Sequence, residues 1–123
     1  MTTAPGVRAV HLAHPVDGEL GGFRVRTDAL TPGLMEAERA DHVDRENGIE
    51  VGVWEGTAGQ FPARRDGYSE ICQILSGRAI LHSNGGERTE LAAGDTIIMP
   101  TGWTGTWELL EPTRKLYIIV DDR

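Results

Sequence analysis

Two residue types that often do chemistry occur only once in this chain. Lys115 is the only lysine among 12 basic residues, and Cys72 is the only cysteine. A lysine can act as acid, base or nucleophile because its pKa moves on burial, or it can form a buried ion pair. A thiol reacts when a cation lowers its pKa, but a strand cysteine between isoleucine and glutamine is more often inert packing. Both interpretations of each residue stay open at this stage.

Short strands must position these side chains, because turn residues divide the chain at close intervals. The chain has 16 glycines and 6 prolines, which favours many turns. Asn47-Gly48 precedes an alternating apolar run over residues 49–53, and this pattern is typical of a hairpin. We therefore expect a strand over residues 36–44, rather than the helix that its composition would also allow.

The rest of the chain predicts further strands of the same kind. Apolar segments that end at turn residues are expected to form strands over residues 70–75, 78–82, 88–91, 96–99, 104–110 and 114–120, with one more around Phe23–Arg26. Short strands at this spacing indicate an antiparallel sandwich or barrel, and closing a barrel removes exposed edges. We assign residues 1–35 to an N-terminal arm and residues 36–123 to a single β-barrel domain.

Size and charge restrict the possible functions. A chain of 123 residues with 39% hydrophobic and 25% charged residues fits one globular domain. The net charge of −7 argues against a sequence-independent nucleic-acid binder and gives no support for binding an anionic membrane. A lone cysteine forms no internal disulfide, and no segment resembles a signal peptide or a transmembrane helix. The sequence therefore predicts a cytoplasmic protein without nucleic-acid or membrane partners.

Two blocks of the chain resemble the paired motifs of the cupin family. The first motif runs Gly-x5-His-x-His, then three or four residues, Glu, six residues and Gly. Here Glu70 is followed by six residues and then Gly77, while Ala63 and Arg65 stand where the histidines would be. The first block therefore keeps the glutamate and the glycine of the motif without its histidines.

The second motif runs Gly-x5-Pro-x-Gly-x2-His-x3-Asn. Its first three members are present as Gly94, Pro100 and Gly102, whereas Gly105 replaces the histidine and Leu109 the asparagine. The spacing of the turn residues therefore agrees with a cupin, although the polar members of the motif are absent.

A wider run of residues narrows the resemblance. Val51–Glu55, Gly94-Asp95, Gly105–Trp107 and Glu111–Tyr117 resemble the ureidoglycine aminohydrolase-like cupin subfamily, and also the cupin of ethanolamine utilisation. The resemblance covers about residues 38–120. It implies an all-β, single-domain cupin, built as a double-stranded β-helix or jelly-roll barrel, and a homodimer that pairs through its sheet surfaces.

The resemblance also sets an expectation about metal binding. Cupin metal sites use three histidines and one carboxylate, and only Glu70 of the corresponding positions here can ligate, because Arg65 is a permanent cation that only donates hydrogen bonds. The four histidines of the chain are His11, His14, His42 and His82, and none stands at a motif position. We therefore expect no metal at the usual place, and no cofactor.

If Glu70 faces the barrel interior as the family's glutamate does, its orientation determines which other side chains face inward. Side chains alternate along a strand, so Cys72 and Ile74 would face inward too. Arg65 would then lie near Glu70, unless a shift of one residue puts Arg64 in its place. The pairing of Arg65 with Glu70 can be structural. Alternatively, Arg65 can bind an anionic ligand, and Glu70 beside it can act as a base or as a hydrogen-bond acceptor.

The same alternation applies to the later strands. Trp107 would share the inward face with Gly105 and would fill the space that a histidine leaves there. Tyr117 would share a face with Lys115, which can pair with Glu70 or with Glu108. The predicted ligand-binding residues are therefore Arg65, Glu70, Cys72, Trp107, Lys115 and Tyr117.

Three functions are compatible with this set. The first is the binding of a small molecule, such as an anionic metabolite, without a metal. The second is a small metabolic enzyme related to ureidoglycine aminohydrolase, which acts on a nitrogenous or ureide compound with Glu70 and Lys115 as its catalytic acid–base pair. The third is a non-catalytic accessory or structural subunit whose barrel is filled by its own side chains.

Overall fold

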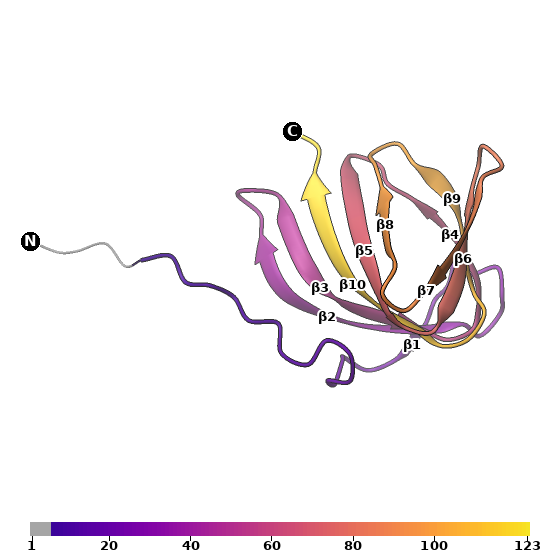
Figure 1. Cartoon of the computed structure of the whole chain (residues 1–123), viewed down its shortest axis with the longest axis horizontal. Coiled ribbons are helices and arrows are strands. Elements are labelled where there is room, and N and C mark those ends of the chain that lie inside the picture. Colours follow the sequence, from indigo (N-terminus) through magenta and orange to yellow (C-terminus); the bar gives the residue numbers. More distant parts are fainter. Residues whose placement is uncertain (1–5) are drawn as a thin grey trace, which may run out of the picture.

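The protein consists of two antiparallel β-sheets that face one another, as Figure 1 shows. The computed structural model describes residues 6–123, and this part of the chain contains strands and turns but no helix. The strand order is β1-β2-β3-β10-β5-β8 in the larger sheet and β4-β9-β6-β7 in the smaller one. The strands are β1 (Arg24–Val25), β2 (Met35–Asp44), β3 (Ile49–Gly56), β4 (Gly59–Arg64), β5 (Tyr68–Ser76), β6 (Arg78–Ser83), β7 (Arg88–Ala92), β8 (Thr96–Met99), β9 (Thr104–Leu109) and β10 (Thr113–Asp121).

The strand that was expected before the Asn47-Gly48 turn is confirmed as β2. It pairs antiparallel with β3 from Glu36 opposite Gly56 to Asp44 opposite Ile49. Gly48 has a φ of 69° in this turn, a backbone conformation that side chains disfavour and glycine adopts freely. The strands predicted from residue 70 onward are also confirmed as β5 to β10, with ends that differ by only a few residues.

Strand β4 was not predicted, because Pro62 interrupts its pattern. Proline cannot donate a backbone hydrogen bond to a neighbouring strand, and it is therefore confined to edge strands and bulges. Strand β4 lies at the edge of the smaller sheet and pairs only with β9, with Pro62 opposite Thr106. The edge position explains how a strand can form here despite the proline.

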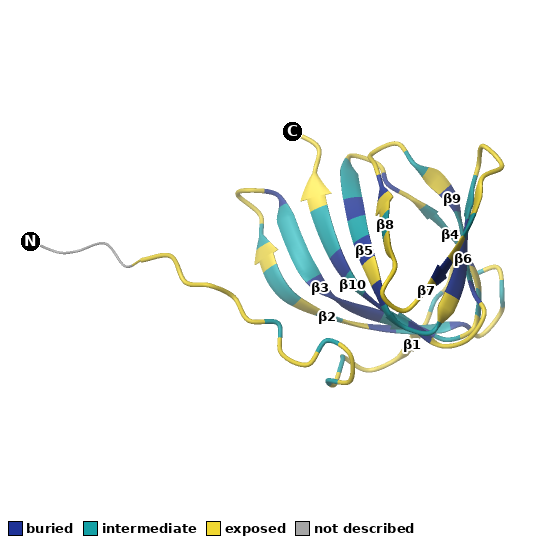
Figure 2. Ribbon diagram, in the orientation of Figure 1, coloured by how far each residue is buried: buried dark blue, intermediate teal, exposed yellow. Residues whose placement is uncertain are grey.

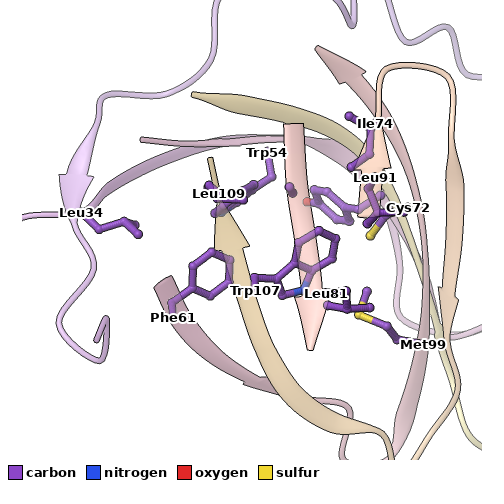
Figure 3. Packing of buried hydrophobic residues seen from close by; sticks show 12 residues of the cluster. Leu34, Trp54, Phe61, Cys72, Ile74, Leu81, Leu91, Met99, Trp107 and Leu109 are labelled. Atoms are coloured by element: carbon purple, nitrogen blue, oxygen red, sulfur yellow. The ribbon is translucent and has the colours of Figure 1, made fainter. Parts of the chain in front are cut away.

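The core lies between the two sheets. Buried residues alternate with more exposed ones along several of the strands (Figure 2). Figure 3 shows the indole of Trp107 beside Phe61 and Leu81 in this core. The rings of Phe61 and Trp107 stack with their centroids 6.5 Å apart. Each large apolar side chain buried in this way stabilises the fold by about 1.5–3 kcal/mol.

The segment before β2 divides into two parts. Residues 6–12 lead away from the barrel in Figure 1, and Val7 and Val10 are exposed on them. Residues 13–21 are hydrogen-bonded to the barrel: the N–H of Gly21 donates to the carbonyl oxygen of Glu38 at 3.1 Å, and Arg114 Nη1 donates to the carbonyl oxygen of Gly18 at 2.8 Å. Beyond this point β1 pairs with β2, and Leu34 is buried in the core with 1% of its surface exposed. The last residues of the expected arm therefore pack against the barrel. The described residues contain no helix long and apolar enough to cross a membrane.

Candidate functional site

A cluster of three buried charges lies between the sheets. Glu70 Oε1 is 3.1 Å from Arg65 Nη2, and Glu70 Oε2 accepts a hydrogen bond of 3.0 Å from Lys115 Nζ. Each of the three side chains has less than a tenth of its surface exposed. Two cations therefore share one carboxylate, and the cluster carries an excess of positive charge.

Strand alternation places two members of this cluster. Glu70, Cys72 and Ile74 are all buried on β5, as the sequence predicts, while Ile71 and Gln73 between them are more exposed. On β10 the buried positions include Lys115 and Tyr117. Because β10 lies directly beside β5 in the sheet, the ammonium group of Lys115 reaches the carboxylate of Glu70.

Backbone hydrogen bonds fix Arg65 at the end of β4. Its N–H donates to the carbonyl oxygen of Trp103 at 2.8 Å, and its carbonyl oxygen accepts from the N–H of Gly102 at 2.6 Å. The side chain of Arg65 therefore faces inward, whereas Arg64 is exposed. The alternative in which Arg64 takes the inward place is wrong.

The three charges stabilise one another in the ionised state. Burial alone would raise the pKa of the Glu70 carboxyl, but Lys115 and Arg65 outweigh this effect and hold that pKa below its usual value. Burial alone would lower the pKa of Lys115, but the acidic groups of Cys72 and Glu70 hold it above its usual value, against repulsion from Arg65. At neutral pH the cluster is therefore an ion pair and not a proton-exchanging acid and base.

Cys72 lies beside the cluster as a protonated thiol. Its Sγ donates a 2.7 Å hydrogen bond to Glu70 Oε2, and its side chain is completely buried. Burial raises the pKa of this thiol to about 12, and Glu70 adds to the rise although Lys115 opposes it. Cys72 therefore has the properties of inert packing rather than of a reactive thiol.

Two indole rings flank Lys115. Its Nζ lies 5.0 Å from the ring centroid of Trp54 and 4.6 Å from that of Trp107, which is the geometry of a cation–π interaction. Trp107 has only 1% of its surface exposed, and its Nε1 has no hydrogen-bond partner among the described residues. The rings replace part of the hydration that Lys115 loses on burial.

Tyr117 lines the same cavity as the cluster and contacts two further carboxylates. Its hydroxyl donates to Glu50 at 2.9 Å and lies 3.4 Å from Glu38. Burial and these two acidic groups raise the pKa of the phenol. Gly52 provides the space for this hydroxyl, because a Cβ atom there would lie 2.6 Å from Tyr117 Oη.

A cavity of about 200 Å³ opens above the charged cluster. Four of the six predicted ligand-binding residues line it, namely Arg65, Glu70, Lys115 and Tyr117. The other lining residues are Arg26, Glu38, Glu50, Trp54, Phe61, Ala63, Tyr68 and Ile119. Cys72 and Trp107 lie behind this surface and do not line the cavity, because the other side chains of the core cover them.

Sequence reasoning missed Glu50 and Glu38, although strand alternation could have found them. Glu50 shares a face of β3 with Gly52 and Trp54, and Glu38 lies opposite Trp54 on β2. The period of two along each strand is the signal that places these carboxylates on the inward face.

Position 105 has no free space for a side chain. A Cβ atom on Gly105 would overlap the carbonyl oxygen of His82 and would lie 2.6 Å from Cζ2 of Trp103. The indole of Trp103 is held there by a 2.9 Å hydrogen bond from its Nε1 to Ser83 Oγ. Trp103 therefore covers Gly105, and the prediction that Trp107 fills this space is wrong.

Glu108 was expected as an alternative partner of Lys115, but it has another partner. Its Oε1 lies 2.9 Å from His82 Nε2, and both side chains are partly exposed. Glu108 and Trp107 are neighbours on β9, so their side chains point to opposite faces of the sheet. Glu70 is therefore the carboxylate that Lys115 contacts.

The residues around Glu70 do not fit a divalent metal ion. Such an ion binds imidazole, thiolate and carboxylate ligands, but the nearest neighbours of Glu70 are two cations and a protonated thiol. Over residues 6–123, no group of three or more His, Cys, Asp or Glu side chains is placed to hold a metal ion.

Comparisons with known proteins agree with the fold. The family model described as the EutQ-like cupin domain matches residues 43–117. A proposed ethanolamine utilization protein of Salmonella typhimurium is 20% identical with a TM-score of 0.66, over 99% of both chains. The EutQ protein of Clostridium difficile is 18% identical with a TM-score of 0.66, over 79% of this chain and 70% of its own.

A third known structure is similar to this chain over less than half of its own length. The match is a protein of unknown function from Pseudomonas syringae, 20% identical with a TM-score of 0.70 over 83% of this chain. This chain spans 43% of the length of that protein. No match was found among curated proteins. At these identities the three structures show the fold alone.

Two facing antiparallel sheets around a charged cavity define a single-domain cupin of the jelly-roll type. Because the family model covers more than half of the residues, the chain belongs to the EutQ-like cupin domain family.

Proposed function

We propose that this cupin binds a small anionic molecule in its barrel cavity, without a metal ion. The observation that carries the proposal is the burial of Arg65 and Lys115 against the single carboxylate of Glu70. An unbalanced charge is costly to bury unless a counter-charge reaches it. Glu38 and Glu50 also line the cavity, but they accept hydrogen bonds from the Tyr117 hydroxyl and form no ion pair with Arg65 or Lys115. An anion beside Lys115 would therefore balance the second cation of the cluster, and this gain would favour its binding.

Lys115 is the residue best suited to contact the anion. An ammonium group has three donors, and the structure gives one of them to Glu70. The guanidinium of Arg65 contacts Glu70 through Nη2 and donates from Nη1 to the carbonyl oxygen of Arg64 at 3.0 Å, while its buried Nε has no hydrogen-bond partner among the described residues. We therefore assign direct contact with the anion to Lys115, and Arg65 contributes its charge and this one unpaired donor.

The walls of the cavity suit a short carbon skeleton. Trp54, Phe61, Ala63 and Ile119 line the cavity as apolar surface beside the charged cluster. Its volume of about 200 Å³ is below the usual range for drug-sized ligands, about 300–1,000 Å³. A small metabolite with a carboxylate or similar group matches this size and chemistry.

The two other functions have less support. A metal-free acid–base enzyme, related to the ureidoglycine aminohydrolase-like subfamily, would need Glu70 or Lys115 to exchange protons near neutral pH. The depressed pKa of Glu70 and the raised pKa of Lys115 oppose this role. A purely structural subunit would need no cavity, whereas a cavity reaches the charged cluster.

Replacing Lys115 with methionine should abolish most of the anion binding. Met fills a similar volume without the charge, and Glu70 keeps Arg65 as its partner, so we expect the variant to fold. Loss of a buried charged contact costs about 2 kcal/mol or more, which is roughly a 30-fold loss of affinity. Binding is measured by titration with monocarboxylates of two to six carbons at constant ionic strength. Tryptophan fluorescence reports the binding, because Trp54 lines the cavity.

Arg88→Ala is the matched control, because Arg88 is an exposed cation paired only with Glu90. We expect it to bind as the wild type does. Equal affinity of the Lys115→Met variant and the wild type would refute the assignment, and so would the absence of saturable binding by any small carboxylate.

A further inference from the structure

A second and larger hollow adjoins the barrel cavity. Its volume is about 610 Å³, and Arg26, Ala63, Arg65 and Tyr68 line both spaces. We call this hollow the outer groove; its other lining residues are Asp28, Pro62, Arg64, Asn84, Thr104, Gly105 and Thr106. Four residues belong to both surfaces, so the two hollows adjoin at the edge strand β4. A ligand that occupies both must pass around this edge, beside Arg65 and Tyr68.

The outer groove carries an excess of positive charge, although the chain as a whole has a net charge of −7. Its lining includes three arginines, Arg26, Arg64 and Arg65, but only one carboxylate, that of Asp28. Asp28 is already paired with Arg26, whose Nε lies 2.7 Å from Oδ1. Over residues 6–123, the guanidinium of Arg64 has no carboxylate partner within ion-pair distance, and it is exposed.

Neutral hydrogen-bond donors lie next to Arg64. Thr104 is its direct partner across β4 and β9, and Thr106 lies opposite Pro62. These outward positions share one face of the smaller sheet, because residues two apart on a strand point the same way. The amide of Asn84 is held at this edge by a 2.7 Å hydrogen bond to Thr104 Oγ1. A free guanidinium beside hydroxyl groups is the chemistry that recognises an oxyacid group.

We propose that the ligand of this protein carries two anionic oxyacid groups, the first at Lys115 in the barrel cavity and the second at Arg64 in the outer groove. This inference rests on the proposed function, because it extends the same ligand from the cavity into the groove. A small dicarboxylate is the simplest member of the class. Arg64 then determines specificity, since it distinguishes a molecule with two charged ends from a molecule with one.

The test compares acids that differ in one group. The dicarboxylates are succinate, glutarate and adipate. The monocarboxylates are butyrate, valerate and caproate, which have the same chain lengths but a single carboxylate. All six are titrated at constant ionic strength, and tryptophan fluorescence is the signal. We expect at least one dicarboxylate to bind the wild type about tenfold more tightly than its monocarboxylate counterpart. In the Arg64→Ala variant this advantage should disappear, while the affinity for the monocarboxylate stays unchanged.

The outcomes separate this inference from the proposed function. Arg64 is an exposed side chain, so its replacement should leave the fold intact, and Arg88→Ala again serves as the control for loss of a surface charge. If monocarboxylates bind but dicarboxylates gain nothing, or if Arg64→Ala keeps the advantage, the second anionic group is refuted and the proposed function stands. If neither class of acid binds, both are refuted.

Discussion

The Glu70→Gln variant should lose about 3–5 kcal/mol of its free energy of unfolding at neutral pH. Glu70 is the only carboxylate that contacts Arg65 and Lys115 among the ion pairs of the described residues. Glutamine keeps the shape of the side chain but removes its charge, which leaves two buried cations close together without compensation. Urea unfolding of the variant and the wild type measures this difference.

Glu90→Gln is the matched control for this experiment. Glu90 also pairs with an arginine, but its side chain is 74% exposed, so the same substitution should change stability by less than about 0.5 kcal/mol. A loss in Glu70→Gln no larger than that of Glu90→Gln would show that the buried cluster does not depend on its carboxylate.

The stabilising role of the Glu70 charge can also be tested by measuring the free energy of unfolding at acidic pH. The folded pKa of Glu70 is depressed, so its contribution to stability is present above the unfolded value of about 4.3 and is lost as the pH falls through the folded pKa. The wild type should therefore lose more stability in this acid range than the Glu70→Gln variant does. Parallel stability curves for the two proteins below pH 4.3 or so would contradict the depressed pKa.

Modification of Cys72 in the native protein should be slower than in the unfolded chain by about three orders of magnitude or more. Thiol reagents attack the thiolate, and a rise from the ordinary pKa of about 8.5 to about 12 removes nearly all thiolate near pH 8. The complete burial of the side chain slows the reaction further. The rate of alkylation by iodoacetamide, followed by mass spectrometry with and without urea, measures the effect.

A thiol placed on the surface provides the control. In a Cys72→Ala background, Glu87→Cys puts a cysteine at an exposed position between β6 and β7, where the native protein should react at nearly the rate of the unfolded chain. Comparable native rates for Cys72 and for this surface thiol would show that the β5 side chain is accessible and would return it to the ligand-binding set.

Once the cupin resemblance had placed Glu70 inward, local periodicity was sufficient to predict the other inward side chains of its strand. Cys72 and Ile74 followed from the period of two on β5, and the contact of Lys115 with Glu70 was one of two predicted alternatives. The hairpin at Asn47-Gly48 also followed from local signals. These features depend on residues that are close in sequence or on one pairing between neighbouring strands.

Features that depend on the packing of several strands could not be derived in this way. The position of the Trp103 ring against Gly105 depends on where β6 places His82 and Ser83 beside β9. The contacts of the Tyr117 hydroxyl join β10 to carboxylates on β3 and β2. The outer groove combines β4 and β9 with the segment before β2, which gave no readable pattern. The homodimer that the resemblance implies stays a prediction.

The burial of Lys115 has a consequence for the surface of the molecule. Within these 123 residues every other basic side chain, apart from the histidines, is an arginine, and the one lysine is enclosed between the sheets. The folded surface of residues 6–123 therefore displays no lysine ammonium group, and its permanent positive charges are guanidinium groups. Acetylation, ubiquitination, glycation and amine-directed crosslinking all require an accessible primary amine, and the folded barrel offers them no side chain.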